Sequence, residues 1–115
     1  MSTAHISITT TPLDERTLAI ALAGELDIDT ADLIEPALSG LTGTAPQALV
    51  LDLAGVSFCD SSGAALFERL HGRCAEAGIR LCLCRIPRLT ALVIRTLGVD
   101  RTVPCSFATD RSRHL

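Results

Sequence analysis

The order of apolar and polar residues divides the chain into short segments typical of strands and helices. Residues 5–11 (HISITTT) alternate apolar with polar side chains, as in a half-exposed strand. Residues 17–26 (TLAIALAGEL) are mostly apolar, as in a buried strand, and the LDER sequence between the two is typical of a turn. We therefore expect the chain to begin with a β-hairpin.

A helix is predicted next, from Asp29 to about Leu41, where apolar residues fall at helical spacing. Gly43 follows as a stop signal. Pro36 interrupts this pattern, because a proline inside a helix removes a backbone hydrogen bond. The helix is therefore expected either to begin near Asp32 or to have an irregular first turn.

Two further helices are predicted by apolar residues at helical spacing. One follows the DSSG sequence and closes at Gly78, and the other has Pro87 as its first residue and ends at Gly98. Residues 108–115 are expected to form at most a final turn of helix.

Three more strands are expected between and after these helices, at residues 47–56, 79–86 and 101–107. The apolar run at residues 47–56 is typical of a strand that is covered on both faces. Two strands followed by alternating helix and strand indicate an α/β layer fold with a mixed sheet.

Composition excludes several kinds of chemistry. The chain has 115 residues, the usual size of one domain, and 48% hydrophobic with 20% charged residues is typical of a globular protein. All ten basic residues are arginine, which excludes Schiff-base catalysis, a Walker A lysine and a Ser-x-x-Lys nucleophile. With no Tyr or Trp and a net charge of −3, direct binding to nucleic acid is not expected.

No segment is long and apolar enough to cross a membrane, and the first 16 residues lack the features of a secretory signal. We therefore expect a cytoplasmic protein without membrane contact. An odd number of cysteines without an export signal argues against a disulfide framework, and no ligand spacing favours a metal site. We expect the thiols to act as small buried hydrophobic side chains: Cys59, Cys74, Cys82, Cys84 and Cys105.

Charge is unevenly distributed along the chain. Residues 1–60 hold one arginine and nine acidic residues, a balance of −8, whereas residues 61–115 hold nine arginines and four acidic residues, a balance of +5. Solvated faces of a compact fold explain this pattern, and so does a polarised surface that binds a charged protein partner.

The stretch FCDSSGAAL, residues 58–66, joins a predicted strand to a predicted helix and holds the most unusual polar cluster. Three explanations are open for its serines: a nucleophile, a helix cap, or a hydroxyl that another protein modifies. The nucleophile needs a base. His71 lies nine residues beyond Ser62, about 13 Å along a helix, and no G-x-S-x-G elbow is present, so a hydrolase is not expected.

The cap explanation accounts for one residue of the cluster but not for all. Asp60, Ser61 and Ser62 are each good N-cap residues, yet a helix needs only one. Gly63 weakens a first helical turn, which suggests that something must approach the backbone closely there. A phosphate on a serine at this position would meet free N–H groups and the positive end of the helix dipole.

Three segments carry a resemblance to a known family. GELDIDTA (24–31), LVLDLAGVSFCDSSGAAL (49–66) and IPRLTALVIRTLGVDRTVP (86–104) resemble, in order, the signatures of the STAS domain, and within it the stand-alone bacterial anti-sigma factor antagonists. The resemblance implies a single domain over residues 1–115, with a core at about 5–110. It also implies a mixed sheet of four to five strands with helices packed mainly on one face.

The resemblance implies a function without catalysis and without a cofactor or metal. The unphosphorylated antagonist would bind an anti-sigma factor that is also a serine kinase of the histidine-kinase-like ATPase fold, and so release a sigma factor. Phosphorylation of the antagonist would end this binding, and a metal-dependent serine phosphatase would reverse the phosphorylation. The alternative within the family is a scaffold or regulatory subunit of a signalling complex or lipid transporter.

Matching the motif residue by residue makes Ser62 the phosphoacceptor. Asp60, Ser61 and Gly63 would shape its site and contact the partner, and the family fold places the loop that holds Asp27 nearby. Asp52 also matches and is expected to be structural. Two departures from the family pattern are Ala64, where a larger aliphatic residue is common, and a short basic tail in place of the last helix.

Overall fold

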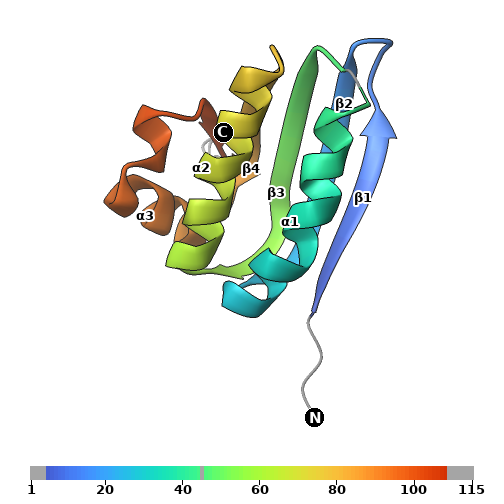
Figure 1. Ribbon diagram of the computed structural model, residues 1–115. Helices are drawn as coiled ribbons and strands as arrows, with labels where there is room; N and C mark the ends of the chain where they lie inside the picture. Colours follow the sequence, from blue (N-terminus) through green and yellow to red (C-terminus); the bar gives the residue numbers. More distant parts are fainter. Residues whose placement is uncertain (1–4, 45, 109–115) are drawn as a thin grey trace, which may run out of the picture.

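The computed structural model describes residues 5–44 and 46–108, which form one α/β domain (Figure 1). Five strands and three helices follow one another, with a single turn of 3₁₀ helix at Val99–Arg101. The strands are β1 Ile6–Pro12, β2 Thr17–Leu26, β3 Ala48–Cys59, β4 Arg80–Ile86 and β5 Cys105–Phe107. The helices are α1 Ile28–Thr42, α2 Ser61–Glu76 and α3 Arg88–Leu97.

The sheet is mixed, with its strands in the order β1-β2-β3-β4-β5. β1 and β2 form the expected antiparallel hairpin, and every later neighbour is parallel. Parallel neighbours need a crossover, and α1, α2 and α3 supply the three crossovers. The predicted fold class, an α/β fold with a mixed sheet of four to five strands, is therefore confirmed.

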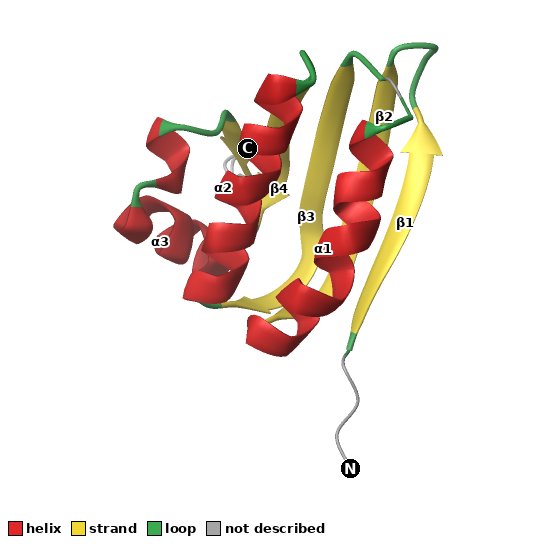
Figure 2. Cartoon of the chain, viewed as in Figure 1, coloured by secondary structure: helices red, strands yellow, loops and turns green. Residues whose placement is uncertain are grey.

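The helices cover one face of the sheet, and α1 and α2 lie side by side across it (Figure 2). Side chains of β3 alternate accordingly: Leu49, Leu51 and Leu53 are buried beneath the helices, whereas Val50 and Asp52 on the open face are half-buried. This core is large enough to hold the domain together without disulfides, and all five cysteines are free.

The cysteines are less uniformly buried than expected. Cys59 and Cys74 lie in the core as predicted. Cys82 and Cys84 do share one face of β4, but that face carries no helix, so their side chains are only half-buried. Cys105 on the edge strand β5 is also half-buried.

The first helix begins within one residue of the predicted Asp29, but neither of the two effects expected of Pro36 is observed. α1 begins at Ile28 rather than near Asp32, its first turn is regular, and Pro36 lies inside it. A cap at Asp27 stabilises this early start, and Pro36 is on the exposed side, where a carbonyl left without its N–H donor can bond to water.

Smaller differences occur later in the chain. β3 continues to Cys59, three residues past the predicted strand, and β5 is limited to three residues. Pro87 is the N-cap of α3 rather than its first residue. Of the predicted final turn of helix, residues 109–115 lie outside the described residues.

The open face of the sheet holds an ion pair between Asp52 and Arg85. Arg85 has φ of +51°, a left-handed conformation, at an irregularity in the β4–β5 pairing. The Nε of Arg85 lies 3.2 Å from both oxygens of Asp52, and this contact holds the pKa of the Asp52 carboxyl below its usual range. The expected structural role of Asp52 thus has a physical basis.

Asp52→Asn tests that role. A carboxyl whose pKa is lowered in the folded state stabilises it above the unfolded pKa of about 4, and this stabilisation is lost as the pH falls through the folded pKa. Because Arg85 is mostly exposed, we expect Asp52→Asn to lower the free energy of unfolding at pH 7 by less than about 1 kcal/mol. Urea titrations should show that the difference in stability between the wild type and Asp52→Asn shrinks as the pH falls below about 4. A difference that stays constant with pH would contradict this role.

Candidate functional site

The predicted site residues lie where the carboxyl ends of β2 and β3 meet the amino-terminal ends of α1 and α2 (Figure 1). In open α/β sheets this edge is the usual position for functional residues. The backbone N–H of Asp60 donates to the carbonyl of Leu26 at 3.1 Å. This bond joins the β3–α2 junction directly to the β2–α1 junction.

Asp60 is the N-cap of α2. Its Oδ1 accepts a hydrogen bond from the backbone N–H of Ser62 at 2.8 Å, and its backbone carbonyl accepts from the N–H groups of Gly63 and Ala64. Ser61 and Ser62 are therefore the first and second residues of the helix, not its caps. The cap explanation holds for Asp60 alone and leaves both hydroxyls for another role.

Asp27 is the N-cap of α1 and forms a capping box with Thr30. Asp27 Oδ1 accepts from the Thr30 N–H at 3.0 Å, and Thr30 Oγ1 accepts from the Asp27 N–H at 2.9 Å. The Thr30 N–H bond lowers the pKa of the Asp27 carboxyl. Asp27 follows Leu26, whose carbonyl accepts from the Asp60 N–H, and the Asp27 side chain orders the start of α1.

Gly63 is buried against the protein's own core. A Cβ at this position would lie 2.6 Å from Cys59 Sγ and 3.1 Å from Leu26 Cβ, which is too close for either contact. The expectation that something approaches the backbone here is correct, but the neighbour is the end of the sheet rather than a partner. Glycine lets the first turn of α2 pack directly onto β2 and β3.

Ser61 is exposed and Ser62 is half-buried. No described residue forms a hydrogen bond with either hydroxyl. Both serines line a pocket of about 400 Å³ between the first turns of α1 and α2. The other residues that line it are Ile28, Ala31, Asp32, Ala65 and Arg69.

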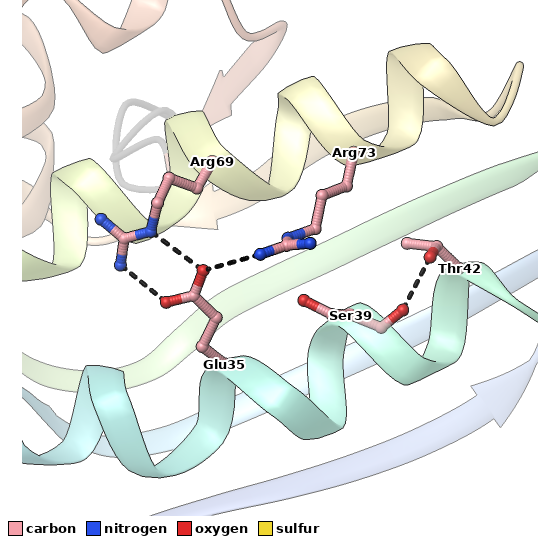
Figure 3. Close-up of polar contacts among 5 residues, drawn as sticks. All are labelled: Glu35, Ser39, Thr42, Arg69 and Arg73. Carbon is pink, nitrogen blue, oxygen red and sulfur yellow. Dashed lines mark hydrogen bonds and ion pairs between the residues drawn. The ribbon is translucent and has the colours of Figure 1, made fainter.

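Arg69 is a site residue that the motif does not reveal. Its Nε and Nη2 donate to the two carboxylate oxygens of Glu35 at 2.9 and 2.8 Å, which lowers the pKa of Glu35 and ties α2 to α1 (Figure 3). The sequence did contain a signal for Arg69. Ser62 and Arg69 are seven positions apart, and residues with this spacing lie on nearly the same side of a helix. Asp32 and Ile28 come from the other helix, so only packing brings them to Ser62.

Among the described residues, no histidine lines the pocket that holds Ser61 and Ser62. Burial, and then the charge of Asp60, raise the pKa of the Cys59 thiol to about 12, so it stays protonated. His71 lines a separate pocket with residues at the amino-terminal ends of β3 and β4, the opposite end of the sheet. Within residues 5–44 and 46–108, no His, Cys, Asp and Glu side chains cluster to hold a metal ion. His114 lies outside the described residues.

Exposed apolar side chains occur on α1 and near the end of β3, and Ile28 among them lines the pocket of the serines. Ile28 at the first turn of α1 is 62% exposed, Leu33 is 59% exposed, and Phe58 near the end of β3 is 48% exposed. Exposed large apolar groups can mark a protein-binding surface, and others lie on the β1–β2 turn and on α3: Leu13, Leu89, Leu92 and Leu97. Acidic residues lie beside Ile28 and Leu33 on α1, including Asp29 and Asp32.

The comparisons with known proteins agree with this arrangement. The STAS domain family model matches residues 9–112. The chain belongs to the STAS domain family. Among the described residues, none of its helices is long and apolar enough to span a membrane.

Similar proteins include regulators of sigma factors. The anti-sigma-F factor antagonist RsfB of Mycobacterium tuberculosis is 29% identical to this STAS domain over 84% of the chain and 79% of RsfB. An anti-sigma factor antagonist from Mycobacterium paratuberculosis has a TM-score of 0.80 at 23% identity, covering 94% of this chain and 90% of that one. SpoIIAA, solved unphosphorylated and phosphorylated, has TM-scores of 0.74 and 0.68 at 21% identity, covering 94% of this chain and 93% and 96% of the SpoIIAA chains.

Gly63→Ala tests the packing that positions Ser62. We expect it to lower the free energy of unfolding by about 1–3 kcal/mol, because the added methyl group collides with Cys59 Sγ and Leu26. Gly72→Ala in the same helix is the matched control. A Cβ there meets no atom within 4 Å, so it should stabilise the protein by about 0.5–1 kcal/mol. Urea denaturation measures both.

The same collision predicts a coupling between two substitutions. Cys59→Ala removes the Sγ atom that lies closest to the new methyl group, so Gly63→Ala should cost less in that background than in the wild type. Strictly additive effects, or a stabilising Gly63→Ala, would show that the contact does not constrain the site.

Proposed function

We propose that this protein is a cytoplasmic anti-sigma factor antagonist that phosphorylation of Ser62 switches off. The single observation that supports this best is the free Ser62 hydroxyl, which lines an open pocket at a capped helix end among exposed apolar and acidic residues. RsfB is named as an antagonist of an anti-sigma-F factor, and SpoIIAA has been solved with and without phosphate. The role of a scaffold or transporter subunit has no comparable support.

The partner we propose is an anti-sigma factor that is also a serine kinase of the histidine-kinase-like ATPase fold. The Ser62 oxygen attacks the γ-phosphorus of ATP, the bond to the bridging oxygen breaks, and ADP leaves. The proton of the hydroxyl passes to a base of the kinase. Water replaces the serine oxygen when a metal-dependent phosphatase reverses the reaction.

Local structure explains why the helix tolerates the modification. The phosphate adds about −1.5 to −2 charges at the positive end of the α2 dipole, which favours negative charge. The cap bond from Asp60 uses a different group of Ser62, its N–H, and stays in place. The helix therefore keeps its cap when Ser62 carries the phosphate.

The consequence for the partner is electrostatic. Asp32 and Asp60 already make this end of the domain negative, and the phosphate adds to them. At a protein surface, one extra repulsion of about 1.4–3 kcal/mol weakens binding by about ten- to a hundredfold. A partner that docks on Ile28, Leu33 and Phe58 would bring its own charges next to the phosphate.

Ser62→Ala should abolish phosphorylation, because it removes the attacking oxygen. The partner is first captured from a lysate of the source organism, purified, and incubated with ATP. Intact-mass spectrometry should then show one added phosphate, about 80 Da, on the wild type and on Ser61→Ala, but not on Ser62→Ala. Equal modification of Ser62→Ala would overturn the assignment of the acceptor.

Ser62→Asp should weaken binding to the captured partner through charge. We expect about a three- to tenfold weaker Kd at 20 mM salt and a smaller difference at 500 mM, where screening is stronger. Ser62→Asn has nearly the same size without the charge and should bind within about twofold of the wild type. Isothermal titration calorimetry measures all three, and equal affinity of Ser62→Asp and the wild type at low salt would refute the repulsion mechanism.

A further inference from the structure

Arg69 lies within reach of a phosphate on Ser62. Seven residues of α-helix advance about 10.5 Å and return to nearly the same side of the helix. Arginine side chains in a helix extend toward its amino-terminal end, and the Arg69 guanidinium does so (Figure 3). Its reach and that of a phosphoserine together match this separation, and both residues line one pocket.

The hydrogen bonds of Arg69 leave part of its guanidinium free. Glu35 engages Nε and Nη2, while Nη1 donates to no described residue. Arginine is well suited to hold two groups at once, because its five N–H donors form a planar fork that matches phosphate and carboxylate oxygens.

Arg69 is not the only arginine that pairs with the Glu35 carboxylate. Arg73, one turn further along α2, lies with Nη2 at 3.6 Å from Glu35 Oε2 (Figure 3). If Arg69 turns toward Ser62, the Glu35 carboxylate therefore keeps a cation. The α1–α2 contact can rearrange without leaving a charge unpaired.

The charges around Ser62 make such a contact favourable. The acidic groups that face the pocket or its rim are Asp32 of α1 and the N-cap Asp60 of α2, and Glu35 lies beyond Arg69. A phosphate dianion is repelled by all three. Arg69 is the basic residue among those that line the pocket.

We propose that Arg69 is the intramolecular partner of the phosphate on Ser62, holding it in the pocket between α1 and α2. This inference rests on the proposed phosphorylation of Ser62. Arg69 thereby acts as a positioning residue: it fixes the phosphate at the partner-binding end of the domain, and it shifts its own pairing from Glu35 alone to Glu35 and phosphate.

The test uses protein in which phosphoserine is incorporated at position 62 during translation, so that no kinase is needed. A ³¹P NMR titration gives the second pKa of the phosphate, about 6 for an unpaired phosphoserine. A nearby guanidinium favours the dianion, so Arg69→Gln should raise this pKa by about 0.5–1 unit relative to the phosphorylated wild type. Arg69→Lys, which keeps the charge without the fork, should give an intermediate value.

Arg73→Gln is the matched control, since Arg73 also contacts Glu35 but lies a further turn from Ser62. It should change the phosphate pKa by less than about 0.2 units. An effect of Arg69→Gln no larger than that of Arg73→Gln would overturn the proposal. Circular dichroism of each variant checks the fold, and Arg69→Lys alone decides the question if Arg69→Gln does not fold.

Failure of this inference is distinct from failure of the proposed function. If the captured kinase leaves Ser62 unmodified, the proposed switch is wrong, whatever the titration shows. If the kinase modifies Ser62 but the titration is insensitive to Arg69, the switch stands and the Arg69 contact is wrong.

Discussion

The close packing of the first turn of α2 onto the ends of β2 and β3 is the constraint on which the site depends. Gly63 lies where any side chain would collide with Cys59 and Leu26, and the N–H of Asp60 bonds to the carbonyl of Leu26. Together these contacts set the position of α2 against the sheet. They also bring the start of α1 beside the start of α2, which creates the pocket that Ser62 lines.

Asp60 and the two serines after it have different roles: Asp60 caps α2, whereas Ser61 and Ser62 keep their hydroxyls unbonded in the described part of the chain. Asp60 uses its side chain and carbonyl to satisfy the N–H groups of the first turn, so the hydroxyls of Ser61 and Ser62 remain without protein partners among the described residues. A hydroxyl with no structural task can be modified without unfolding the helix. The same geometry suits a substrate of another enzyme better than a nucleophile, since it holds Ser62 away from His71.

Much of the fold and part of the site could be predicted from the sequence. Strands and helices follow from apolar periodicity, and the DSSG sequence marks the strand–helix junction because Asp and Gly have distinct local roles there. The effect of Pro36 on α1 was predicted wrongly, because its penalty was given more weight than the capping signal of Asp27 and Thr30. The half-buried Cys82 and Cys84 could not be foreseen, because an apolar run does not say which face of a strand lacks a helix.

The sequence by itself determined the order of the elements, the family and the position of Ser62 at a strand–helix junction, because these depend on local periodicity and on a short motif. Only the tertiary structure decided what surrounds that residue. Ile28, Asp32 and Glu35 come from α1 and meet Ser62 and Arg69 of α2 through the packing of two helices on one sheet. Contacts between residues some 30 positions apart arise from the crossover and the core, and no local pattern encodes them.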